Sequence, residues 1–593
     1  MEQESLQQGN PSVTERISYS IATLPPLKKL IFLIAFIACL IASFSLLSQI
    51  SERYLVLVPD YGGELNEGVI GRPRFINPVL AKSDVDRDLT QLIFSGLLKS
   101  TPDHGLIPDL ASSYDISQDG LTYTFTLRDQ IFWHDGEPIT AQDVAFTIEK
   151  VQDKSLAIKS PRRASWDDVT VETPDNKTVV LTLKQAYAPF LENTTMGIIP
   201  KHIWMNIPND EFDQSFYNLN PIGSGPYRID IIVNDESKGL PESYHLRSFH
   251  NYALGRPYID RINLHFFGNS NELINGYREK KIDQIHTIAP SVARELESIG
   301  TPIARTELPR TFAAFINSTE NEALKDRAVR EAMNHAVNKE KIIEQVLLGY
   351  GKVIDGPLPY LLGTSSLAGT HPIDEATRAN ESRAILEKAG WEFDKDALIM
   401  KKVDKKAKKE IPLEFSISVP DAEELTKTAQ LLKEDWERIG AKVTVKVYEI
   451  STFSVEVLAP RKYDVLFYGQ VIGRNPDLYP YWHSSQRTAP GLNVALYASR
   501  PTDKLLEELR KEHDEMKREE ILHAITDEIW RDIPAVFVYS PYFLYARRGD
   551  IEGAVTGTIT TESERFLDVH NWFIEKDHVW RFFRDKMGRQ QSL

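Results

Sequence analysis

The segment 108–151 constrains the fold of this chain most, because its turns and caps fix the order of its elements. The turn at 119–120 precedes residues 121–127, where apolar and threonine side chains alternate with the period of a half-buried strand. After a second turn, Thr140 and Asp143 form the capping-box pattern that begins a helix. The segment therefore predicts a strand, a turn, a second short strand and a capped helix.

The same segment resembles the signature of the family 5 extracellular solute-binding proteins, the peptide- and nickel-type receptors of ABC importers. The resemblance covers roughly residues 54–540. Its strongest matches are Pro-Asp-Leu-Ala at 108–111, Asp-Gly-Leu-Thr-Tyr at 119–123, the run 134–144, Gly-Ser-Gly-Pro-Tyr at 223–227 and the run 328–338.

This resemblance implies an α/β, two-lobed fold like that of the type II periplasmic binding proteins, with an extra small inserted lobe and one preceding N-terminal transmembrane helix. The expected segments are a flexible N-terminal tail 1–27, a transmembrane anchor 28–50, domain I (first part) 54–98, the inserted small lobe (domain II) 99–220, domain I (second part) 221–310, domain III 311–532, and the return to domain I with the C-terminal tail 533–593.

An apolar run at 30–47 follows Lys28 and Lys29, and as a helix it is about 27 Å long, enough to cross a bilayer core. The lysines place the N-terminus inside and the rest of the chain outside. An uncleaved anchor competes with a lipoprotein lipidated at Cys39 and with a cleaved signal peptide. The run is long for a signal peptide and stays apolar at 40–47, where a lipoprotein begins a polar tether, which favours the anchor. We therefore expect a single-pass protein of the cell membrane whose globular part lies outside the cytoplasm.

The length of 593 residues indicates two or three domains, since one hydrophobic core does not grow to this size. A formal net charge of -16 argues against nucleic acid as a partner, because such binding depends on clustered Lys and Arg. The single cysteine allows no intrachain disulfide.

The sequence contains no nucleophile elbow, HExxH pair, CxxC set or phosphate loop. We therefore predict no enzyme activity, no catalytic residue, no cofactor and no metal site. His245, His250 and His265 lie close together in sequence, but we interpret them as surface or packing residues of neighbouring strands.

The most informative candidate site is the loop 468–483. In peptide-binding members of the family this loop carries an aspartate that holds the ligand's α-ammonium. Here no acidic residue lies between Tyr468 and Asp477, and Arg474 stands near the expected place. Either Asp477 takes over, or Arg474 pairs with a carboxylate or phosphate of the ligand, or the loop is structural with Arg474 on the surface.

From the resemblance and this loop we predict a set of ligand-binding residues: Asn77, Phe312, Asn317, Gly469, Gln470, Arg474, Asp477 and Trp482. The function implied is that of the substrate-binding protein of an ABC importer, which captures short peptides or similar extended solutes between its lobes and presents them to permease subunits. Two alternatives stay open: a sensing or scaffold receptor without transport, and an anchored extracellular hydrolase.

Overall fold

The computed structural model describes residues 20, 22–23, 25–101, 105–235, 239–286, 288–359, 374–404, 409–474, 476–548, 551–554, 557 and 559–580. The chain forms two compact units, Met1–Asp60 with Glu575–Leu593, and Tyr61–Ile574. Most of the predicted N-terminal tail lies outside the described residues.

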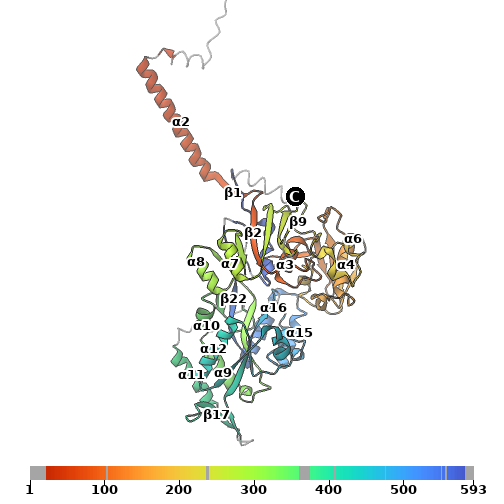
Figure 1. Cartoon of the computed structure of the whole chain (residues 1–593), viewed down its shortest axis with the longest axis vertical. Coiled ribbons are helices and arrows are strands. Elements are labelled where there is room, and N and C mark those ends of the chain that lie inside the picture. The colour runs from red at the N-terminus through yellow and green to blue at the C-terminus, as the bar shows by residue number, and fades with distance from the viewer. Residues whose placement is uncertain are drawn as a thin grey trace, which may run out of the picture. The chain divides into compact units, whose positions relative to one another are not determined.

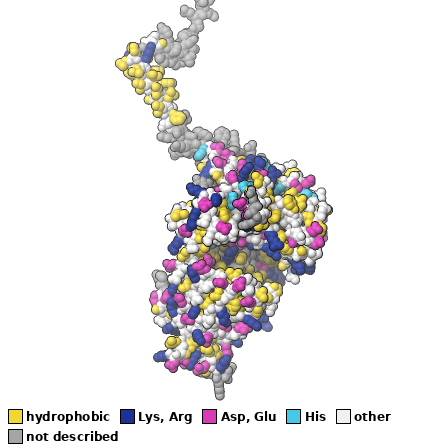
Figure 2. All heavy atoms as spheres, in the orientation of Figure 1, with side chains coloured by type: hydrophobic (Ala, Val, Ile, Leu, Met, Phe, Trp, Pro, Cys, Tyr) yellow, Lys and Arg dark blue, Asp and Glu magenta, His cyan; other side chains and the backbone are white. Residues whose placement is uncertain are grey.

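In the first unit, the long helix α2 (Pro26–Tyr54) leads into β1 (Leu55–Pro59), which pairs antiparallel with β23 (Lys576–Trp580) (Figure 1). The part Pro26–Leu46 is long and apolar enough to cross a membrane, and none of it is buried. Figure 2 shows hydrophobic side chains covering this helix. Exposure of this much apolar surface to water is unfavourable.

The second unit is built on a mixed sheet of twelve strands, in the order β20-β19-β21-β14-β22-β12-β2-β11-β10-β9, with β13 and β15 also paired to β22. The strands are β2 (Glu64–Ile70), β9 (Tyr227–Asn234), β10 (Pro241–Ser248), β11 (Arg261–Phe267), β12 (Gln284–His286), β13 (Ile303–Glu307), β14 (Arg310–Ile316), β15 (Gly351–Val353), β19 (Glu414–Pro420), β20 (Lys442–Tyr448), β21 (Val465–Val471) and β22 (Ala535–Arg547).

The strand β22 joins the two lobes. Its first half pairs with β14 and β15, and its second half pairs with β12 and β13. In Figure 1 the label β22 lies between the lobe that carries β2 and the lobe that carries α12 (Glu423–Arg438). One continuous strand therefore runs through both lobes, and the predicted two-lobed α/β fold is confirmed.

A separate four-stranded sheet in the order β5-β6-β8-β7 forms the small lobe. In β6 (Thr122–Leu127), Tyr123, Phe125 and Leu127 are buried while the threonines between them are at least partly accessible, as the alternation predicts. The helix α4 (Ala141–Gln152) begins at the predicted capping box. The other strands of this sheet are β5 (Ala111–Ile116), β7 (Val169–Glu172) and β8 (Thr178–Leu183).

Apolar alternation at 413–419 and at 443–447, with an amphipathic helical pattern between them, predicts a βαβ unit. This unit is confirmed, since β19 and β20 are parallel and α12 connects them.

The apolar stripe of Leu89, Leu92, Ile93 and Leu97 predicts an amphipathic helix over 86–98. This prediction is wrong at its end, because α3 (Asp84–Ile93) stops at Phe94, which adopts an extended conformation. Beyond Phe94 the backbone leaves the helical path, and the N–H of Leu97 donates to the carbonyl of Thr194 at 3.0 Å.

The remaining helices cover the sheets. They are α5 (Phe190–Asn193), α6 (Lys201–Trp204), α7 (Ser270–Arg278), α8 (Pro290–Ser298), α9 (Arg327–Ala336), α10 (Lys339–Val346), α11 (Glu375–Lys388), α13 (Ile450–Phe453), α14 (Tyr479–Trp482), α15 (Arg500–Leu509) and α16 (Glu515–Asp532), with short helical turns η1 (Arg163–Ser165), η2 (Phe212–Gln214), η3 (Phe216–Asn218), η4 (Ala323–Lys325), η5 (Ser454–Leu458), η6 (Ser484–Gln486), η7 (Glu562–Phe566) and η8 (Val569–Asn571). Small ladders complete the fold: β3 (Leu98–Ser100) with β4 (Leu106–Pro108), and β17 (Ile399–Asp404) with β16 (Glu392–Asp394) and β18 (Lys409–Pro412).

Candidate ligand-binding cleft

The strand β21 presents a free edge. It pairs with β14 along its whole length, from Val465 to Val471, but with β19 only at Val465 and Leu466. Beyond Leu466, its second edge has no strand partner among the described residues. Because an unpaired edge offers backbone donors and acceptors to an added strand, this part of β21 can bind an extended chain.

A cavity of about 500 Å³ lies beside this edge and is called here the apolar cavity. Tyr468, Gly469, Gln470 and Val471 form one wall. The other walls are the turn around η5 and the loop 489–492. Its lining is mainly carbon, which suits uncharged side chains of a ligand.

Glycine is required at 469 because of the strand opposite. Phe312 of β14 faces Gly469 across the pair, and a Cβ at 469 would lie 2.6 Å from the Phe312 ring. That ring stacks on Tyr539 with 5.1 Å between centroids, so it is held in place. The predicted residues Phe312, Gly469 and Gln470 are therefore brought together, and the last two line the apolar cavity.

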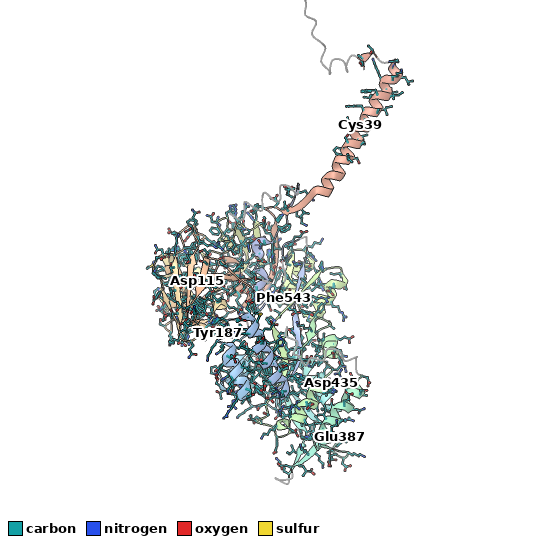
Figure 3. The ribbon with its side chains drawn as sticks, turned by 180° about the vertical axis from the view of Figure 1, so that it is seen from behind. Cys39, Asp115, Tyr187, Glu387, Asp435 and Phe543 are labelled. Carbon is teal, nitrogen blue, oxygen red and sulfur yellow. The ribbon has the colours of Figure 1, made fainter. Side chains whose placement is uncertain are left out.

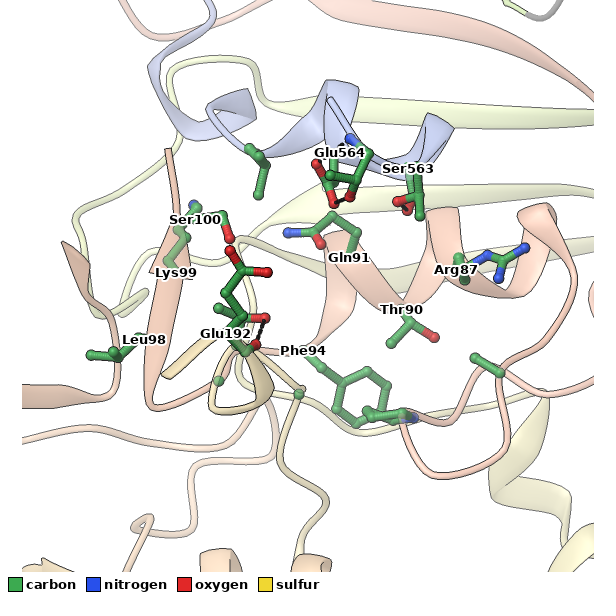
Figure 4. Close-up of a pocket in the computed structure, with 18 of the residues that line it drawn as sticks. Arg87, Thr90, Gln91, Phe94, Leu98, Lys99, Ser100, Glu192, Ser563 and Glu564 are labelled. Atoms are coloured by element: carbon green, nitrogen blue, oxygen red, sulfur yellow. Dashed lines mark hydrogen bonds between the residues drawn. The ribbon is translucent and has the colours of Figure 1, made fainter. Parts of the chain in front are cut away.

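A second cavity of about 300 Å³, called here the charged cavity, lies between α3, β3, the small lobe and the segment 560–567 (Figure 4). Arg87, Lys99, Arg162 and Arg474 supply positive charge to its lining. The acidic side chains in the lining are Asp109, Glu192 and Glu564. Its lining contains more charged side chains than the lining of the apolar cavity.

Burial shifts the acid–base behaviour of two residues of the charged cavity. The pKa of Asp109 is raised to about 6 by burial, against the opposing effect of Lys99. The pKa of Lys99 is lowered, again mainly by burial, and its Nζ donates to the hydroxyl of Tyr252 at 2.9 Å. One Asp109 oxygen, Oδ1, is buried and accepts no hydrogen bond from the described residues.

Arg474 joins the end of β21 to the lobe that carries β2. Its Nη2 lies 2.6 Å from a carboxylate oxygen of Glu564, and its Nη1 donates to the carbonyl of Thr101 at 2.5 Å. Only 3% of its side chain is exposed. The interpretation that placed Arg474 on the surface is therefore wrong, because a carboxylate 90 residues later in the chain draws it inside.

Asp477 is engaged by residues of the protein itself. Arg510 pairs with it through Nε at 3.1 Å and Nη2 at 2.6 Å, and the hydroxyl of Tyr187 donates to it at 3.3 Å. Tyr187 belongs to the small lobe, at its edge in Figure 3, and its pKa is raised by burial and by Asp477. Recognition of a ligand's ammonium by Asp477 would have to compete with this ion pair.

Comparison with known proteins identifies the family. The model of the bacterial extracellular solute-binding proteins, family 5, matches residues 105–491. This chain belongs to that family.

Several relatives are similar over most of their length. The oligopeptide-binding protein AppA of Bacillus subtilis is 27% identical over 84% of this chain and 89% of its own length. The structure of AppA in complex with a nonapeptide has a TM-score of 0.63 at 25% identity, covering 87% of this chain and all of that one. The structure of NikZ from Campylobacter jejuni in complex with Ni(L-His) has a TM-score of 0.66 at 26% identity, covering 86% of this chain and 99% of that one.

Three predicted site residues of this solute-binding protein lie inside its core. Asn77 is fully buried and bonded to Asn218, and Asn317 is fully buried and bonded to the carbonyl of Arg461. Trp482 is 1% exposed, within an apolar cluster beneath β14. No ligand can touch these three side chains in this arrangement, and a role in binding stays a prediction for the set as a whole.

Other residues of the charged cavity were missed from the sequence, above all Arg162, Glu192 and Glu564. They lie in segments without a recognisable motif, and only folding brings them together. His245 and His265 do lie on the neighbouring strands β10 and β11, with ring centroids 6.2 Å apart. Among the described residues, no group of three or more His, Cys, Asp or Glu side chains is placed to hold a metal ion.

Proposed function

We propose that this protein captures short peptides in the cleft between its lobes and presents them to the permease of an ABC importer, while its N-terminal helix holds it at the membrane. Membership of the solute-binding family supports capture in place of catalysis.

The observation that carries the peptide proposal is the free edge of β21 beside the apolar cavity. A peptide added to this edge would satisfy its backbone groups by hydrogen bonds that do not depend on sequence. Its side chains would enter a cavity large enough for varied apolar groups. The similarity to AppA, whose structure holds a nonapeptide, agrees with this reading.

Closure of the lobes would couple binding to recognition by the permease. Figure 2 shows this unit hollowed between its two lobes. A ligand that contacts both lobes favours the closed form, and the hinge would include β22, which crosses between them. The bond from Arg474 to Glu564 already spans the same gap.

The ligand can be identified by native mass spectrometry of the full chain in detergent, followed by denaturation and analysis of what is released. A mixed set of short peptides is the expected result. Release of one non-peptide compound, or no binding from a peptide library, would exclude the peptide proposal.

A pair of matched variants tests the site. Val471 and Val447 are both 46% exposed, but only Val471 lines the apolar cavity. Val471→Asp places a charge beside the proposed peptide and should weaken binding about tenfold or more, whereas Val447→Asp should not. Equal effects of both variants would show that peptides do not lie along this edge.

The anchor is tested by fractionation of cells that express the full chain. Retention of a chain with an intact N-terminus in the membrane supports the anchor, and a shortened N-terminus in a soluble fraction contradicts it. Cys39 lies on α2 (Figure 3), so Cys39→Ser separates a lipid attachment from a spanning helix. The variant should stay in the membrane if the helix alone is the anchor.

A further inference from the structure

Arg461 connects the two walls of the apolar cavity that do not belong to β21. Its Nη1 donates to the carbonyl of Leu458, at the end of η5, at 2.7 Å, and its Nε donates to the carbonyl of Arg487 at 3.2 Å. Its Nη2 donates to the carbonyl of Gly491, in the loop 489–492. One buried side chain therefore holds the turn around η5 and this loop together.

The backbone of Arg461 is held in a conformation that residues with a side chain rarely adopt. Its φ is 57°, in the left-handed region. Asn317, which is fully buried, donates to the carbonyl of Arg461 at 3.0 Å. Such a conformation persists only where its surroundings fix it. Asn317 therefore acts on the cavity through Arg461, although no ligand can reach its own side chain.

Two further bonds hold the same loop. Gln470, on β21, donates from Nε2 to the carbonyl of Leu492 at 3.4 Å. The hydroxyl of Tyr463 donates to the carbonyl of Val494 at 2.6 Å. Like the bonds of Arg461, these end on backbone carbonyls, so they fix the path of the chain and with it the width of the cavity.

Apolar side chains are kept exposed around the cavity. Val471 and Leu492 both line it, and each is 46% exposed. Apolar side chains grouped at a recess mark a place where a ligand group is buried. The free energy gained grows with the apolar area removed from water, and about 500 Å³ has room for the largest apolar side chains. A methyl group would leave most of this surface in contact with water.

We infer that Arg461 is a positioning residue that sets the size of the apolar cavity, and that the cavity selects solutes with a large apolar side chain. The inference rests on the proposed function, because that function supplies the peptide that carries this side chain. A wall fixed before binding pays no ordering cost when the ligand enters. Without the bonds of Arg461 the loop 489–492 would have to be ordered by the ligand, and a large side chain would lose most of its advantage.

The test measures binding of five-residue alanine peptides in which each position in turn carries phenylalanine, by isothermal titration of the full chain in detergent. The best of these should bind the parent at least about tenfold more tightly than the all-alanine peptide. In Arg461→Gln this ratio should decrease to less than about threefold. Arg461→Lys keeps the charge but not the planar fork, so it should lower the ratio as well, and it carries the comparison if Arg461→Gln does not fold.

Arg518→Gln is the matched control. Arg518 is 9% exposed, as Arg461 is, and it donates to the carbonyls of Leu509 and Glu512 at 2.7 and 2.9 Å. It does not line the apolar cavity, so its replacement should keep the parent's ratio. A ratio that decreases equally in the variants of Arg461 and Arg518 would show a general loss of stability and overturn the role of Arg461.

Two other results would also overturn the inference. One is a parent that binds the alanine and phenylalanine peptides equally well, and the other is an unchanged ratio in both variants of Arg461. If no peptide binds, the proposed function fails, and N-acetyltryptophan amide serves as the probe of the cavity. This compound should raise the melting temperature of the parent and of Arg518→Gln but not that of Arg461→Gln, and no change in the parent would exclude the cavity as a site for large apolar groups.

Discussion

The apolar cavity and the charged cavity differ in how their walls are made. Most of the apolar cavity comes from one strand and two nearby turns of a single lobe, and it offers backbone groups and carbon surface. The charged cavity is assembled from α3, the small lobe, the segment 560–567 and Arg474, which lie far apart in the sequence. The first cavity offers mainly apolar surface, and the second carries charged side chains of both signs.

The largest effect should come from the ion pair that closes the charged cavity. Glu564→Gln removes the carboxylate with which the buried Arg474 pairs, and loss of one partner of such a pair costs about 3 to 5 kcal/mol of unfolding free energy. Urea denaturation measures this loss of unfolding free energy. The double variant Arg474→Met with Glu564→Leu should regain much of the loss, and if it is no more stable than Glu564→Gln, the buried charge is not the cause.

The second largest effect should be the dependence of stability on pH that comes from Asp109. Its pKa is raised from 3.8 to about 6 in the folded protein, so the folded state holds the proton more tightly than the unfolded state. Folding stability is therefore favoured below pH 4 and decreases as the pH rises to about 6, by up to about 3 kcal/mol. Urea denaturation at several pH values should show that Asp109→Asn gains stability relative to the parent over this range. A constant difference between the two proteins would contradict the shift.

Added side-chain volume in the wall of the apolar cavity should lower the stability of the protein. Gly469→Ala drives a methyl group against Phe312 and should lower stability by about 1 to 3 kcal/mol, because the ring is held by Tyr539 and cannot easily move. Gly268→Ala is the control, since its Cβ meets only the end of the flexible Glu272 side chain at 3.1 Å. Calorimetry compares the two, and a smaller loss at 469 than at 268 would contradict the tight strand pair.

The smallest effect should follow from loss of one hydrogen bond at the end of β21. The hydroxyl of Tyr481 donates to the carbonyl of Val471 at 2.6 Å, beside the apolar cavity. Tyr481→Phe should cost about 1 kcal/mol in thermal denaturation. Peptide binding should change little, and a loss as large as that of Val471→Asp would mean that the tyrosine itself contacts the ligand.

Much of the fold follows from local patterns. The box formed by Thr140 and Asp143 begins α4 as predicted, because both partners lie within one helical turn. The alternation in β19 and β20 with an amphipathic helix between them identified the parallel unit, since burial of one face imposes these periods. The end of α3 was misplaced because the backbone after Phe94 bonds to Thr194, a residue far along the chain that no local pattern contains.

The candidate site also contains some features that the sequence predicted and others that only folding produced. The stretch 468–477 was recognised as a cleft loop from its place in the family pattern, and Gly469 and Gln470 do line a cavity. Asn77 and Trp482 were predicted from their positions along the chain, but both side chains are buried. The position of a residue in the sequence does not show whether its side chain faces the solvent or the core. Lobe boundaries and the roles of the eight predicted residues stay predictions.

By itself, the sequence determined the family, the order of strands and helices, and a helix apolar enough to span a membrane. These depend on short-range periodicity, capping and turn chemistry, which neighbouring residues supply. Only the tertiary structure decided that Arg474 pairs with Glu564 and that Asp477 pairs with Arg510. Charges act on whatever lies within a few ångströms, and that neighbourhood is created by folding.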